Sequence, residues 1–165
     1  EESQRKGIIM FAFSTPQEAT NTIDSSTPFV AASDGNLSLL QQSLVSLSVP
    51  ASVTDSNGLT PLHSAVSYNQ IDVIRWLLTQ NVDVNAGDND GDTPLHHCDN
   101  ASAARVLIEE GNADCKVKNL EGKIALETKD EELREINMGM EEGDSDDEDK
   151  ASLEEVVAYL KTFGL

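Results

Sequence analysis

Three neighbouring residues, His96, His97 and Cys98, are of types that ligate zinc, and the acidic segment at 88–92 is of the type that binds calcium. A zinc site needs ligands that converge on one point, but adjacent residues on a helix point in different directions. An EF-hand calcium loop needs Gly sixth and Glu twelfth, and counting from Gly91 puts His97 twelfth. No G-x-S-x-G, P-loop or dinucleotide-binding motif occurs. We predict no metal site, no cofactor and no catalytic activity.

A six-residue segment recurs at a spacing of 33 positions, since residues 60–65 read TPLHSA and residues 93–98 read TPLHHC. Each copy follows a turn-like segment with Asp and Gly, DSNGL at 55–59 and DNDGD at 88–92. Thr can cap a helix and Pro fits its first position, so each copy predicts a helix start. A 33-residue repeat with this box after a D-x-x-G turn resembles the ankyrin repeat.

This resemblance implies an all-α solenoid of about four helix-turn-helix repeats with short hairpin fingers. The box histidines His63 and His96 would bond to the adjacent repeat, Cys98 would be a small core residue on the helix, and His97 would be exposed. The apolar pattern over 71–78 predicts a partly buried second helix. Asn69 stands where the family usually has Gly, and Asn tolerates a left-handed backbone.

We expect a tail over 1–26 and an ankyrin-repeat domain over 27–165, with repeats at about 27–54, 55–87, 88–117 and 118–165. In the first repeat, Phe29 is placed where the box has His, and the second helix runs from Leu37 to about Val45. The third repeat is shortened by several residues, with one gained back at Asn112. The distance from Thr93 to the corresponding Lys123 is then 30.

The last repeat is expected to be split by an acidic insert over 129–150, which is too polar to fold and forms a solvated loop with at most a helical turn or two. Its second helix begins at Ser152, which makes a capping box with Glu155. Apolar residues of this helix would cover repeat three: Leu153, Val156, Val157 and Leu160. Ser145, followed by four acidic residues, is a candidate phosphosite for an acidophilic kinase.

The net charge is −19, from 30 acidic and 11 basic side chains. Fourteen acidic residues against three basic ones lie between Glu127 and Glu155. Phosphates would be repelled, so we expect no nucleic-acid partner; a basic protein is the natural complement, although the insert could equally serve only solubility. Two cysteines fit no disulfide framework, and the apolar run at 8–13 is too short for a membrane span. These features favour the cytoplasm, the nucleus or both.

The ankyrin resemblance implies non-enzymatic protein binding by a monomer, through the concave face formed by fingers and first helices. The candidate binding residues are those that the fold should not need at these places: Asp55, Ser56, Asn57, Asp88, Asn89, Asp90, Asp92, Asn119 and Glu121 on the fingers, and Ser64, Tyr68 and His97 near the first helices. Two hypotheses remain. The chain is an adaptor or chaperone-like binder of a basic client, or it is a regulatory subunit or scaffold of an enzyme or degradation complex.

Overall fold

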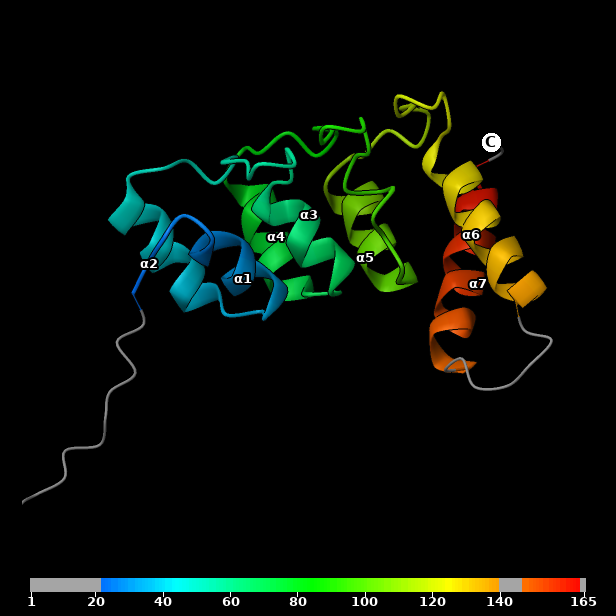
Figure 1. The fold of residues 1–165 in the computed structure, drawn as a ribbon, viewed down its shortest axis with the longest axis horizontal. Helices are drawn as coiled ribbons and strands as arrows, with labels where there is room; N and C mark the ends of the chain where they lie inside the picture. The colour runs from blue at the N-terminus through cyan, green and yellow to red at the C-terminus, as the bar shows by residue number, and fades with distance from the viewer. Residues whose placement is uncertain (1–21, 140–146, 164–165) are drawn as a thin grey trace, which may run out of the picture.

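The computed structural model describes residues 22–139 and 147–163 as a row of helix pairs, with the connecting fingers along one edge (Figure 1). Its helices, in chain order, are α1 (Thr27–Ser33), α2 (Leu37–Leu47), α3 (Pro61–Ser67), α4 (Ile71–Thr79), α5 (Ala101–Arg105), the π-helix η1 (Val106–Glu110), α6 (Ala125–Gly139) and α7 (Asp147–Lys161). The predicted all-α stack is confirmed. None of the helices described is long and apolar enough to cross a membrane.

The box residues start the first helix of repeat two as predicted. Thr60 is the N-cap of α3, Pro61 is its first residue, and the Thr60 and His63 side chains form a reciprocal capping box. The turn to α4 passes through Asn69 at φ 53°, which is the left-handed conformation expected there. The helix boundaries of repeat two therefore follow directly from local sequence.

The first repeat keeps the register predicted for it. α1 and α3 both have seven residues, and Ser26 precedes α1 as Thr60 precedes α3. The N–H of Asn36 donates to the carbonyl of Ala31 (2.9 Å), as the N–H of Gln70 donates to that of Ala65 (2.8 Å). Phe29 therefore takes the place of the box histidine, as predicted.

Repeat three departs most from the repeat pattern. Its box forms only a turn over 94–97 instead of the expected helix, closed by a bond from the His96 N–H to the Thr93 carbonyl (2.8 Å). Asn100 then adopts an extended conformation and its side chain caps α5. Compared with repeat two, three residues are missing between the box and the second helix, so the chain is too short there to form further turns of a first helix. Cys98 is buried as predicted but is not in a helix.

The residue gained back in repeat three is accommodated by the π-helix. The N–H of Gly111 bonds to the carbonyl of Val106 (3.0 Å), five residues earlier, so η1 holds one more residue than an α-helical turn.

The equivalent of Thr93 in the last repeat is Ile124, not the residue before it. His63 bonds to the carbonyl of Asp92, and His96 makes the same bond to Lys123. The spacing from Thr93 is therefore 31, not 30.

The boundaries expected for the acidic insert are also corrected. Residues 129–139 are not a loop, because α6 continues from Ala125 to Gly139. α7 already begins at Asp147, so Ser152 lies inside this helix and does not cap it. The helix extends because residues 147–151 offer no Gly or Pro to stop it. Ser145 lies outside the described residues.

The C-terminal helix covers the stack as predicted. α7 packs on α5 and α6, and the four apolar residues named for this role are all buried: Leu153, Val156, Val157 and Leu160. Val156, Val157 and Leu160 join the continuous core formed by the other repeats, which includes Leu62, Ile74 and Leu107. α7 therefore closes the open end of the stack.

Candidate protein-binding surface

The fingers are tied to one another by backbone hydrogen bonds. The N–H of Asn89 donates to the carbonyl of Asn57 (2.9 Å), and the N–H of Leu120 donates to the carbonyl of Asp90 (2.9 Å). Equivalent places of successive fingers are thus joined in the same way. The fingers form one continuous edge of the stack instead of independent loops.

Glycine is required where one finger meets the next. Gly58 has φ +81°, and a Cβ there would lie 2.8 Å from the backbone nitrogen of Asn89. Gly91 has φ +76°, and its Cβ would lie 2.9 Å from the nitrogen of Leu120. Both the left-handed backbone and the close approach exclude a side chain. The D-x-x-G turn of the sequence is therefore also a contact between repeats.

The box histidines connect the first helices to the next finger. The N–H of Thr60 donates to Nδ1 of His63 (3.0 Å), so Nδ1 is an acceptor and the ring proton sits on Nε2. Nε2 then donates to the carbonyl of Asp92 (3.1 Å). His96 repeats this arrangement with Thr93 and Lys123. The structural role predicted for both histidines is confirmed.

Burial favours the neutral form of His63. Desolvation lowers the pKa of His63 from its ordinary value of 6.5 to about 4, against the opposing hydrogen bond to the Asp92 carbonyl. The nearby His97 lowers this pKa further, since its ring meets that of His63 edge-on with centroids 5.4 Å apart. His63 is therefore a neutral linker between repeats at physiological pH.

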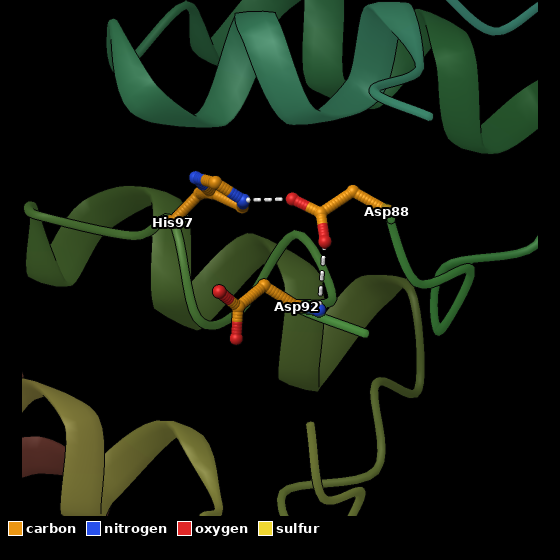
Figure 2. Close-up of side chains that lie close together, drawn as sticks. All are labelled: Asp88, Asp92 and His97. Carbon is orange, nitrogen blue, oxygen red and sulfur yellow. Dashed lines mark hydrogen bonds and ion pairs between the residues drawn. The ribbon is translucent and has the colours of Figure 1, made fainter. Parts of the chain in front are cut away.

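Asp88 and Asp92, at the two ends of the finger at 88–92, lie close to His97 of the following turn (Figure 2). Oδ2 of Asp88 lies 2.9 Å from Nε2 of His97, and its Oδ1 accepts the backbone N–H groups of Asp90 and Asp92 (2.9 Å each). Burial alone would raise the pKa of Asp88, but the hydrogen bonds from His97 and these two N–H groups lower it. His97 was expected to be exposed, but its side chain is only 31% exposed because it packs on Asp88.

This cluster has the residue types of a metal site, since one ligand atom from each side chain lies within 4.8 Å of the others. Both oxygens of Asp88 already accept hydrogen bonds, and Oδ1 of Asp92 accepts the side-chain amide of Asn119 (2.8 Å). A cation would have to displace bonds that hold the turn. The arrangement is explained by the fold alone.

Several candidate binding residues are needed by the fold, contrary to the premise on which they were chosen. Asp55 accepts the N–H groups of Asn57 and Leu59 through its carboxylate. The Asn89 side chain donates to the carbonyl of Ser56 (3.0 Å). Asn119 accepts two N–H groups of its own turn in addition to its bond to Asp92. The D-x-x-G turns thus fold by side-chain-to-backbone bonds, and binding by these residues stays a prediction.

The other candidates differ in how accessible they are. Exposed residues on the finger edge are Ser56, Asn57, Asn89, Asp90 and Glu121. Near the first helices, Tyr68 is 66% exposed, whereas Ser64 is half-buried. Tyr68 therefore offers a largely accessible aromatic ring next to the first helix of repeat two.

We expect Asp88→Ala to destabilise the protein by about 1 to 3 kcal/mol, because two backbone N–H groups and His97 lose their acceptor. The neighbouring Asp90→Ala is the matched control, since Asp90 is exposed, and it should change the free energy of unfolding by less than about 0.5 kcal/mol. Urea denaturation of both variants measures the difference. Equal stabilities would contradict a structural role for Asp88.

Sequence reasoning missed a buried lysine that bridges two carboxylates. Lys129 is 3% exposed and its Nζ contacts Asp99 Oδ1 (2.7 Å) and Glu132 Oε2 (2.9 Å). Desolvation would lower the pKa of Lys129, but the two carboxylates together raise it. In the repeat register, Lys129 occupies the position that Ala65 has in repeat two and Cys98 has in repeat three. Both of those residues are fully buried. A lysine at a position that the other repeats bury was the sequence signal for this charged site.

Comparison with known proteins supports the repeat assignment. A family profile of ankyrin repeats, in three copies, matches residues 29–119. An ankyrin repeat-containing protein of Schizosaccharomyces pombe is 39% identical over 107 residues, which cover 64% of this chain and 51% of that protein. The chain thus spans about half the length of that relative.

Two mouse proteins match over smaller shares of their length. The RelA-associated inhibitor of Mus musculus is 29% identical over 100 residues, 59% of this chain and 12% of that protein. Protein phosphatase 1 regulatory subunit 12A of Mus musculus is 34% identical over 80 residues, 47% of this chain and 8% of that protein.

Proposed function

The chain belongs to the ankyrin-repeat family, and from this premise we propose that it is a non-enzymatic module that binds a basic protein, as an adaptor or a chaperone-like shield. Ankyrin stacks are protein-interaction scaffolds. The fold does not identify the partner, so the choice of a basic client rests on the charge of this chain.

The observation that carries the proposal is a row of exposed carboxylates on the two C-terminal helices. Exposed acidic residues on α6 and α7 include Glu127, Glu131, Glu135, Glu148, Glu154 and Glu155. They belong to a chain with a net charge of −19. Such a surface attracts cationic partners and repels phosphates.

The basic side chains support the same choice. Of the nine lysine and arginine residues in the described ranges, at least five form ion pairs with the protein's own carboxylates: Arg75, Lys123, Lys129, Arg134 and Lys161. Bases held in this way offer little to an acidic ligand. The excess of exposed carboxylates is left for a partner.

The proposal predicts that association depends on the acidic helices. Replacing Glu135, Glu154 and Glu155 together by Gln should slow association with the basic client about threefold to tenfold at low salt and flatten its salt dependence, because exposed charges act by steering. The matched control replaces Asp34, Asp72 and Asp90 by Asn, which removes the same charge from exposed sites elsewhere.

The measurement has two steps. Partners are captured from cells at low salt and identified, and association of the purified client is then followed by surface plasmon resonance at several salt concentrations. The proposal fails if the captured partners are not basic, or if both triple variants associate at the wild-type rate. We expect phosphorylation at Ser145, which adds negative charge, to change the rate in the opposite direction.

A regulatory role is the second candidate, and the names of two relatives favour it, since one is an inhibitor and the other a regulatory subunit. Here the acidic residues would serve solubility, and the partner would pack on the fingers and first helices. Such a partner should remain bound at high salt, where a charge-held client dissociates because exposed charges are screened. The same capture experiment separates the two candidates.

A further inference from the structure

A hollow of about 500 Å³ opens between the second repeat and the C-terminal helices. One wall is the turn that carries Tyr68, and Asp99 lies beside it. The opposite wall is formed by Glu132 and Ile136 of α6 and by Ser152 and Leu153 of α7. The hollow therefore joins four segments that are far apart in the sequence.

The shortened third repeat explains why the hollow exists. α4 begins eleven residues after Thr60, whereas α5 begins eight residues after Thr93, so the turn that would stand beside Tyr68 is three residues shorter. α6, in contrast, is 15 residues long where α3 has 7. Glu132 and Ile136 lie beyond the point at which α3 ends in the repeat register. The short turn of repeat three therefore leaves a recess, and the long α6 extends beyond it to form the facing wall.

The lining combines apolar surface with two carboxylates. The ring of Tyr68 is largely accessible, Leu153 is 5% exposed, and Ile136 is half-buried. The side chains of Asp99 and Glu132 are 62% and 42% exposed. Lys129, which bridges these two carboxylates, is itself only 4% exposed. An incoming group therefore meets two carboxylates and one ammonium group buried behind them, which leaves the hollow negatively charged.

We propose that this hollow is the docking site for an arginine side chain of the protein partner, a proposal that rests on the basic client inferred above. The guanidinium would pair with Asp99 and Glu132, and the aliphatic stem would lie against Ile136, Leu153 and the ring of Tyr68. The occupant follows from this lining: a group with a positive tip and an apolar stem satisfies both kinds of surface.

Arginine suits the hollow better than lysine for two reasons. Its guanidinium is a planar fork of five donors that can bond to carboxylates from two different elements. It also stacks on an aromatic face, which an exposed tyrosine ring provides. An ammonium group is more strongly hydrated and has no plane to stack.

The test uses short synthetic peptides that carry one arginine in an alanine background, with lysine and citrulline peptides for comparison. They are titrated into the ¹⁵N-labelled protein at low salt and followed by NMR. We expect the arginine peptide to shift the amide signals of Tyr68, Asn100 and Ile136, with those of Asn57 on the finger edge unchanged. The citrulline peptide, which keeps the shape and loses the charge, should bind about tenfold more weakly.

Two variants of equal charge locate the site. Ser152→Arg places a guanidinium inside the hollow and should weaken arginine-peptide binding about tenfold. Ala151→Arg adds the same charge at an exposed neighbour outside the lining and should change it less than twofold. Tyr68→Ala, at an exposed site, should weaken binding as well.

The proposal is overturned if the peptide shifts signals across all acidic surfaces equally, or if the two arginine variants bind it alike. It is also overturned if the citrulline peptide binds as well as the arginine peptide. Failure here is distinct from failure of the proposed function. If association with a basic client still depends on Glu135, Glu154 and Glu155 but is unchanged by Ser152→Arg, the proposed function stands. The hollow is then not the docking site.

Discussion

Deletion of residues 147–165 is expected to abolish the cooperative thermal unfolding of the protein and to cause aggregation. α7 buries four apolar side chains against α5 and α6, and each contributes about 1.5 to 3 kcal/mol. Their combined loss is comparable with the about 5 to 15 kcal/mol that stabilises a typical domain. Calorimetry and light scattering of the shortened chain measure the effect.

A single substitution tests the same helix in a chain that still folds. Leu160 is fully buried, and Leu160→Ala should destabilise by about 2 to 5 kcal/mol through lost contacts and the cavity left behind. Glu154→Ala on the exposed side of the same helix should stay within about 0.5 kcal/mol of wild type. A shortened chain that melts like the full one would show that α7 does not close the stack.

Acidification from pH 6.5 to 4 is expected to destabilise the protein through His63 by an amount on the order of 3 kcal/mol. Burial first, and then the charge of His97, lower the pKa of His63 from 6.5 to about 4. In this interval the unfolded chain binds a proton at this site and the folded chain does not. Stability is therefore highest above pH 6.5 and falls as the pH approaches 4.

Comparison with His63→Asn isolates this contribution. The variant keeps a polar side chain that does not titrate, so it should be less stable at pH 7 but lose less on acidification. Urea denaturation at half-unit steps between pH 7 and 4 gives both slopes. Since Asp88, Glu110 and Asp24 also have lowered pKa values, the relevant quantity is the difference between the slopes. Parallel slopes would exclude His63 as the titrating group.

Local sequence determined the fold class and the structural role of the box. In repeat two the TPLH segment caps a helix, starts it with proline and bonds to the next finger, as its residue types predicted. In repeat three the histidine keeps its bond to the next finger, but the helix is replaced by a turn. The burial of Leu153, Val156, Val157 and Leu160 could also be predicted, because a helical apolar stripe must face the core of a stack.

The candidate binding residues were less predictable. Asp88 and Asn119 looked dispensable in the sequence, yet both hold turns and neighbouring fingers. Hydrogen bonds between fingers join residues about 30 positions apart, and a single repeat read alone does not contain its partner. The carboxylates of the turn aspartates are already engaged in hydrogen bonds that stabilise the fold.

By itself, the sequence determined that this is an acidic, all-α ankyrin stack with a covering C-terminal helix, since repeats, caps and apolar stripes are local and periodic. Only the tertiary structure decided how the irregular C-terminal half is arranged. It extended α6 past the expected start of the insert, absorbed one residue in a π-helix, and buried Lys129 between Asp99 and Glu132. These outcomes depend on which repeats lie against each other, and hence on distances across the stack that no local pattern encodes.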